Sequence, residues 1–167
     1  MYKRQTLEVG DEICDKDAVA HCVKNSKSAI DWLIEMGVNF TMTQNGGKLH
    51  LTQEGGHSKR RVAHSKDTTG KEVSNSLIAK ARKLKNITIY ENHLAVDLIT
   101  SNRSCQGAYV FDKKKEQVIT FKSNATILAS GGASKVYLYT SNPDGTSGDG
   151  MALAWRAGCE LSNMEFN

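Results

Sequence analysis

The stretch ILASGGASKVYLYTSNPDGTSGDGMALAWRAG, residues 127–158, decides the fold class of this chain. It continues a nearly unbroken apolar segment, residues 124–130, of the kind typical of a strand buried on both faces of a parallel sheet. The segment stops at a glycine pair, residues 131–132. Glycines at the end of a buried strand leave room for another backbone or for a ligand, because they carry no Cβ.

A helix is expected directly after a second group of glycines. Residues 147–150 read SGDG, a helical pattern runs on to Ala157, and Gly158 supplies the stop. Free backbone N–H groups at the start of a helix attract polar or anionic ligand atoms, and Asp149 lies there; the same spacing also fits a plain helix N-terminal residue. Since open α/β sheets bind ligands beyond the carboxyl ends of their strands, the two glycine groups together indicate a nucleotide cofactor without naming it.

The rest of the chain predicts an α/β protein with an inserted antiparallel β-meander. One helix is expected from a cap at Asp15 to a stop at Gly37, with its apolar side in the core, and a second over residues 71–84. Residues 1–5 fit no element and are interpreted as a non-native or mis-assigned start. The remaining expectations are a hairpin over 38–51, a polar loop over 52–70, and strands at 87–90, 95–100, 106–112, 117–123 and 124–130.

Composition limits the function classes. The 167 residues carry 22 basic and 18 acidic side chains, a net charge of +4, which is too small a surplus to indicate nucleic-acid binding. The densest basic stretch, residues 57–66, has no interleaved aromatic residues and is interpreted as a solvated or anion-facing loop. No segment approaches the roughly 20 apolar residues of a membrane span. The four cysteines have no zinc-ligand spacing, so reduced packing thiols and a cytoplasmic location are expected.

Three stretches carry a resemblance to a known family. Residues 125–167, residues 50–73 (HLTQEGGHSKRRVAHSKDTTGKEV) and residues 9–19 (VGDEICDKDAV) resemble the L-aspartate oxidases, a branch of the succinate dehydrogenase/fumarate reductase flavoprotein family. The resemblance covers roughly residues 6–167. It implies a Rossmann-like FAD-binding domain with the inserted meander, together with part of a substrate-capping region.

The resemblance assigns cofactor contacts to particular residues. Asp149, in the family's S/T-G-D-G motif, contacts FAD near the flavin. The strand end that runs beside the cofactor corresponds to Ala129, Gly131 and Gly132, where Ser130 stands in place of a frequent Thr. A neighbouring strand whose backbone meets the adenine corresponds to Ala95 and Val96.

Glu54 is the residue expected to select the substrate. Succinate and aspartate differ by one amino group, and an ammonium needs a local carboxylate for a charge-assisted hydrogen bond. In the T-x-E-G-G-H-S motif of the resembling oxidases, Glu54 is the residue that orients the substrate amino group. Without the motif, Glu54 reads as a surface residue of a polar loop. Arg60 and Arg61 could hold substrate carboxylates or pair with surface acids.

The histidines at positions 50, 57 and 64 are spaced seven residues apart. This spacing does not indicate a metal site, because Gly55–Gly56 interrupts any helix that would align them.

The implied activity is the FAD-dependent oxidation of L-aspartate to iminoaspartate, with oxygen or fumarate as electron acceptor. Iminoaspartate would feed quinolinate and NAD biosynthesis, with a handover to quinolinate synthase. The family carries a G-x-G-x-x-G turn that this sequence lacks, so the chain is expected to be an internal part of such an enzyme, with no catalytic residue of its own. The alternatives are a part of a succinate dehydrogenase or fumarate reductase flavoprotein, which QEGGHSKRR at 53–61 disfavours, and a non-catalytic nucleotide-binding module.

The chain is therefore expected to divide into four parts. Residues 1–5 are the non-native or mis-assigned start, and residues 6–37 are a helical part of the FAD-binding domain. Residues 38–70 form a hairpin and a substrate-side loop, and residues 71–167 form the rest of the FAD-binding domain.

Overall fold

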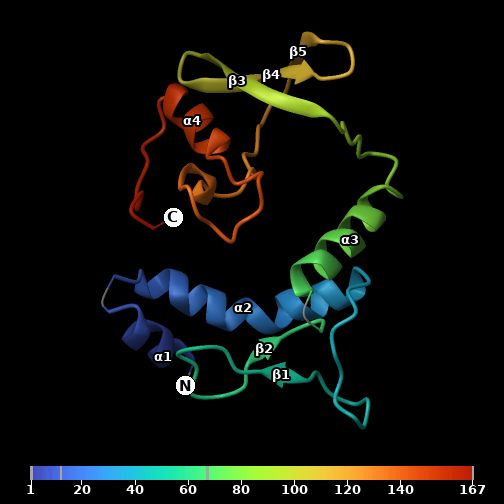
Figure 1. Cartoon of the computed structure of the whole chain (residues 1–167), viewed down its shortest axis with the longest axis vertical. Helices are drawn as coiled ribbons and strands as arrows, with labels where there is room; N and C mark the ends of the chain where they lie inside the picture. The colour runs from blue at the N-terminus through green and yellow to red at the C-terminus, as the bar shows by residue number, and fades with distance from the viewer. Residues whose placement is uncertain (1, 12, 67, 167) are drawn as a thin grey trace. The chain divides into compact units, whose positions relative to one another are not determined.

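The computed structural model describes residues 2–11, 13–66 and 68–166, and Met1, Glu12, Asp67 and Asn167 lie outside the described residues. The chain divides into two compact units, one up to Ile89 and one from Tyr90 (Figure 1). Helices and antiparallel sheets make up both, which confirms the α/β class in outline. Among the described residues every paired strand is antiparallel, so the Rossmann-like arrangement stays a prediction.

The N-terminal helix α1, Tyr2–Val9, was not predicted as a separate helix, although the helical part expected at 6–37 overlaps it. The interpretation of residues 1–5 as lacking any element is wrong for the described part, since Tyr2 to Gln5 form the first turn of α1. The side chain of Gln5 donates a hydrogen bond to the carbonyl of Gly56 at 2.7 Å. Ser58 in turn donates to the Gln5 amide oxygen at 3.3 Å. These two hydrogen bonds to a loop far away in sequence hold α1 in place, although the sequence of α1 has no clear helical periodicity.

The long helix α2, Lys16–Glu35, begins and ends where the sequence predicts. The Asp15 carboxylate accepts hydrogen bonds from the backbone N–H groups of Asp17 and Ala18, and Gly37 ends the helix with φ +96°. Its expected place in a core is wrong, because no residue of α2 is buried. An amphipathic face is buried only where other elements cover it, and the first unit covers this face in part.

The segment between α2 and the helix α3, Thr69–Ala81, pairs differently from the expected hairpin over 38–51. That hairpin is present in part, with one antiparallel bridge between Met42 and Leu49 and backbone hydrogen bonds from Thr43 N to Lys48 O and from His50 N to Thr41 O, both at 2.8 Å. The strands are instead β1, Leu51–Thr52, and β2, Val62–Ala63, so part of the predicted loop is a strand. A further non-local hydrogen bond, from Thr41 N to His64 O at 2.8 Å, joins the preceding segment to the end of β2, and a local pattern cannot show it. Val38 and Phe40, in the segment that leads to this pairing, are buried.

The second unit contains the predicted meander. Strands β3, His93–Ser101, β4, Ser104–Asp112, and β5, Gln117–Lys122, form one antiparallel sheet in the order β3-β4-β5. This confirms three of the predicted strands. The short strand predicted at 87–90 is absent from the structure, although all four of its residues are described.

The apolar segment 124–130 is not a strand, which corrects the central prediction of a buried parallel strand. Ile127 is 88% exposed and Leu128 is 40% exposed. A strand requires hydrogen-bonded neighbours, and no described residue pairs with this segment as a strand. After it come the short 3₁₀ helix η1, Ser134–Val136, and α4, Asp149–Arg156, the helix predicted from the glycine pattern. Within the described part of the chain no helix combines the length and apolar character that crossing a membrane requires.

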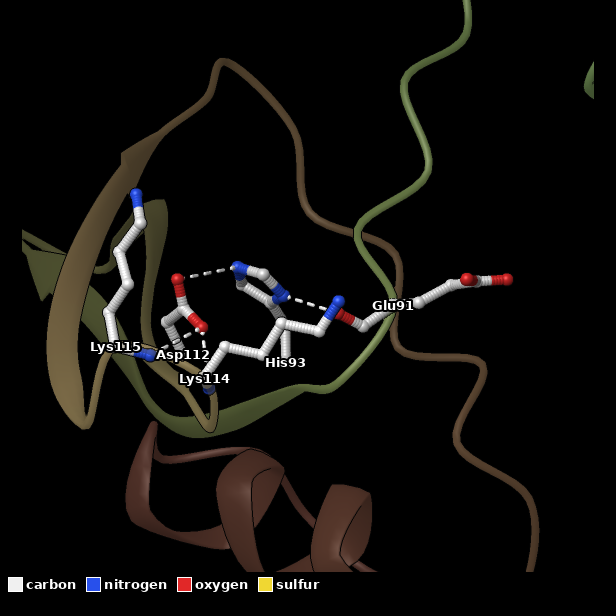
Figure 2. Close-up of polar contacts among 5 residues, drawn as sticks. All are labelled: Glu91, His93, Asp112, Lys114 and Lys115. Carbon is white, nitrogen blue, oxygen red and sulfur yellow. Dashed lines mark hydrogen bonds and ion pairs between the residues drawn. The ribbon is translucent and has the colours of Figure 1, made fainter.

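A buried carboxylate closes the turn between β4 and β5 (Figure 2). Asp112 is 4% exposed, and one of its oxygens accepts from the backbone N–H groups of Lys114 and Lys115 at 2.9 and 3.2 Å. The other oxygen faces His93 Nε2 at 3.7 Å, while His93 Nδ1 donates to the Glu91 carbonyl at 2.7 Å. Burial alone would raise the pKa of Asp112, but the two N–H donors and the charges of His93 and Lys115 together lower it below its ordinary value.

This cluster predicts a loss of stability in acid. Because the pKa of Asp112 is lower in the folded protein than in the unfolded chain, the carboxylate stabilises the fold above about pH 4, and this contribution is lost as the pH falls through the folded-state pKa. We expect Asp112→Asn to lower the melting temperature at pH 7 by a few degrees and to flatten its decline below pH 4. Melting followed by circular dichroism from pH 7 to pH 2 measures both effects. Asp144→Asn, at a carboxylate with 92% side-chain exposure, is the control; an acid decline as steep in Asp112→Asn as in the unaltered protein would contradict the prediction.

Candidate functional site

The start of α4 lies against the glycine pair that ends the segment 124–130. Gly148 precedes the helix in a left-handed conformation, φ +79°, and its N–H donates to the Gly132 carbonyl at 3.1 Å. Asp149, the first residue of α4, is exposed. The start of α4 therefore lies beside the end of the apolar segment, although that segment is not a strand.

The glycines of this region serve two different purposes. A Cβ on Gly150 would lie 1.9 Å from Ser130 Oγ, and one on Gly148 would lie 3.1 Å from the Ala133 side chain. These two glycines let α4 approach the neighbouring segment closely. At Gly131 and Gly132 a Cβ would meet no described atom within 4 Å, so the space there is open. An open glycine pair beside a helix N-terminus fits an anionic or polar ligand such as a dinucleotide.

The opposite end of α4 contacts the other predicted cofactor strand. Ala95 pairs with Val110 and Asp97 with Tyr109, so Val96 is the extra residue of a β-bulge with no partner in β4. The guanidinium of Arg156 donates through Nη2 to the Val96 carbonyl at 3.0 Å and through Nε to an Asp97 carboxylate oxygen at 3.2 Å. One short helix thus touches both regions for which cofactor contacts are expected. Arg156 is missing from the residues predicted from sequence, and only its position in the last turn of a predicted helix could have drawn attention to it.

Glu54 lies in the first unit, in the loop between β1 and β2. The backbone N–H of Glu54 donates to His57 Nδ1 at 3.3 Å, and the His57 N–H donates back to the Glu54 carbonyl at 3.1 Å. Gly56, with φ +75°, completes this turn. The Glu54 side chain is exposed and lines a cavity of about 460 Å³. The other residues that line this cavity are Thr52, Val62, Ala63, His64, Lys66 and Thr69.

The two arginines that follow Glu54, Arg60 and Arg61, do not line the Glu54 cavity. Arg60 Nη1 donates to the Leu51 carbonyl at 3.4 Å. Arg61, together with His57, lines a second and more apolar cavity of about 540 Å³ beside α2. The cationic side chain that shares the Glu54 cavity is instead Lys66, which no sequence motif singles out. Two residues of opposite charge, Glu54 and Lys66, thus line one cavity.

Two of the three regularly spaced histidines lie within hydrogen-bond distance of each other. His50 Nδ1 and His64 Nε2 are 2.8 Å apart across the sheet of β1 and β2, and His64 Nδ1 lies 3.2 Å from the Lys66 carbonyl. Since a carbonyl only accepts, the hydrogen bond to Lys66 requires a hydrogen on His64 Nδ1, and in the neutral tautomer Nε2 then accepts from His50. In the part of the chain that the structure describes, no group of three potential metal ligands occurs.

Comparisons with known proteins identify the family of this chain. The family described as "FAD binding domain" matches residues 3–167. The L-aspartate oxidase of Pseudomonas aeruginosa is 50% identical over 99% of the chain and 33% of its own length, and that of Yersinia pestis is 51% identical over 97% and 32%. Among solved structures, Escherichia coli quinol fumarate reductase superposes with a TM-score of 0.88 at 23% identity, covering 93% of this chain and 26% of that one.

The chain belongs to the FAD-binding family that includes the succinate dehydrogenase and fumarate reductase flavoproteins. Within it, the curated relatives at 45–51% identity over nearly all of the chain carry the name L-aspartate oxidase. The chain spans about a third of the length of these relatives.

Proposed function

We propose that this chain is part of an FAD-dependent L-aspartate oxidase, which oxidises L-aspartate to iminoaspartate by removing two electrons and two protons. Oxygen or fumarate is the proposed acceptor, and quinolinate synthase the proposed recipient of the product. The observation that carries the proposal is the 50% identity to an L-aspartate oxidase over 99% of the chain, a span that includes the Glu54 loop and the Asp149 helix. A succinate-specific or fumarate-specific flavoprotein is the less favoured reading, because the Glu54 cavity holds a carboxylate.

The residues of the second unit fit the cofactor. Asp149 and the N–H groups at the start of α4 would hold polar atoms near the flavin, and the open space at Gly131 and Gly132 would admit the cofactor beside the backbone, with Ala129 on the same segment. The backbone of Ala95 and Val96 would meet the adenine. When bound, FAD supplies the two-electron acceptor.

The residues of the first unit would hold the substrate. The Glu54 carboxylate would accept a hydrogen bond from the substrate ammonium, and Lys66, on the same cavity, would face a substrate carboxylate. This arrangement orients the amino group but abstracts no proton, so the proton-transfer groups are expected elsewhere in the enzyme.

Cofactor binding tests the proposal. In the complete enzyme we expect Asp149→Ala to weaken FAD binding at least about tenfold, because a hydrogen bond to a charged group is lost. Titration of the apoprotein with FAD, followed by flavin fluorescence, measures the dissociation constant. The control is Asp144→Ala, since Asp144 is an exposed acid on the same loop whose ion pair with Lys135 is a surface contact. If Asp149→Ala binds FAD as tightly as the unaltered enzyme, Asp149 does not belong to the cofactor site. If the unaltered enzyme binds no FAD, the proposed function is wrong.

A further inference from the structure

The last turn of α4 is tied to the bulge of β3 by one side chain. The Arg156 guanidinium donates hydrogen bonds to both the Val96 carbonyl and the Asp97 carboxylate, at 3.0 and 3.2 Å. Both charged side chains are about half exposed, 47% for Arg156 and 45% for Asp97. We call these two contacts the Arg156–Asp97 clamp.

The clamp acts on a residue that the sheet itself does not fix. In a β-bulge the extra residue interrupts the ladder, so its position depends on contacts outside the strand pair. Val96 is such a residue, since its neighbours Ala95 and Asp97 pair with consecutive residues of β4. Its side chain is exposed, and Arg156 holds its carbonyl from the side of α4.

We propose that the Arg156–Asp97 clamp is a positioning device for the adenine end of FAD, an inference that rests on the proposed function. The adenine edge presents an amino donor beside a ring-nitrogen acceptor, which an extended residue can match with its own C=O and N–H. Hydrogen bonds weaken steeply when their distance or angle departs from the optimum, so the carbonyl of the bulged residue must be held still. A carbonyl has two lone pairs, and Arg156 occupies one of them while the second stays available to adenine.

The helix that carries Arg156 also links the two halves of the cofactor site. Its eight residues span about 12 Å. At its first turn the Gly148 N–H holds the Gly132 carbonyl, and at its last turn Arg156 holds Val96. A rigid helix between the two contacts sets the spacing between the flavin-side residues and the adenine-side residues.

The chemistry of arginine suits this role. The planar guanidinium reaches the carboxylate and the carbonyl through two differently directed N–H groups, which a lysine ammonium does not reproduce. A half-exposed ion pair adds little to the stability of a fold. The clamp is therefore expected to affect the selectivity of cofactor binding while leaving the stability of the unit nearly unchanged.

The test compares FAD with its hypoxanthine analogue in the complete enzyme. The analogue replaces the adenine amino group with a carbonyl and the neighbouring acceptor nitrogen with N–H, so it inverts the pattern that Val96 would match. Dissociation constants come from flavin fluorescence titration of the apoprotein. We expect the unaltered protein to prefer FAD about tenfold. Arg156→Lys and Asp97→Asn are each expected to reduce this preference to about threefold or less, and the double variant to reduce it no further than either single variant.

The possible outcomes separate a positioning role of the clamp from a general structural role. If both ligands weaken by the same factor and the preference is kept, the clamp only supports the fold and the inference is wrong. If the unaltered protein binds FAD without preference, Val96 does not match adenine and the inference is also wrong. If the unaltered protein binds no FAD, the proposed function itself fails. Arg103→Lys, in the turn between β3 and β4, is the matched control and should keep the full preference.

Discussion

Replacing Gly107 with alanine is expected to unfold the sheet of the second unit. Gly107 lies in the central strand β4, buried, with φ +138°, a conformation that residues with a side chain rarely adopt. A Cβ there would lie 1.8 Å from the carbonyl oxygen of Phe121 on β5. The obstacle is backbone, so no side-chain rotation relieves it.

The expected effect combines backbone strain with a lost strand pairing. Strain of this kind costs about 1–3 kcal/mol by itself, and separation of β4 from β5 adds to it, so we expect a loss of about 3 kcal/mol or more. For a unit of this size the melting temperature should fall by more than about 10 °C. Thermal melting and amide hydrogen exchange in β4 and β5 measure the change.

Gly145→Ala is the control for this prediction. Gly145 has no atom within 4 Å of an added Cβ and no positive φ, so the same chemical change should alter stability by less than about 0.5 kcal/mol. If Gly107→Ala melts at the same temperature as Gly145→Ala, the close approach of β4 and β5 at this position does not exist in solution.

The second large effect is expected at Glu54. Glutamine keeps the shape of the side chain and one oxygen acceptor but removes the charge, so a charge-assisted hydrogen bond to the substrate ammonium becomes an ordinary one. In the complete enzyme we expect Glu54→Gln to lower kcat/KM for aspartate oxidation about 10-fold to 100-fold. Fumarate has no amino group to lose a contact, so its reduction should change by less than about threefold.

Steady-state kinetics with both substrates on the same enzyme preparation measures this difference. Glu35→Gln, at the exposed end of α2, is the matched control in the same unit and should leave both rates unchanged. Equal losses for aspartate and fumarate would show that Glu54 supports the loop and does not recognise the amino group.

Local chemistry was sufficient to predict several elements. The cap at Asp15 and the stop at Gly37 located α2, and the glycines around Asp149 located α4. Alternating apolar residues located the three strands of the meander. In each case the hydrogen bonds that define the element join residues close together in sequence, or strands joined by a short turn.

Non-local contacts explain the elements that were missed. Helix α1 is held by Gln5 against Gly56, and β2 pairs with β1 while His64, just after β2, accepts a hydrogen bond from Thr41 N. The segment 124–130 has the composition of a strand but pairs with no strand among the described residues. Its apolar pattern is therefore not sufficient to form a strand, because a strand also needs a partner strand that the local sequence does not provide.

The sequence by itself, through its family resemblance, determined which residues we propose for the chemistry: the glycines beside Asp149, the extended backbone at Ala95 and Val96, and Glu54 in its motif. Only the tertiary structure decided how they are held. It showed that Gly148 and Gly150 allow close packing, whereas Gly131 and Gly132 face open space. It also showed that Arg156 donates a hydrogen bond to the carbonyl of Val96 in the bulge. The physical reason is that residue type fixes what a group can donate, accept or leave room for, whereas the distance between groups far apart in the chain is set by the packing and the non-local hydrogen bonds of the fold.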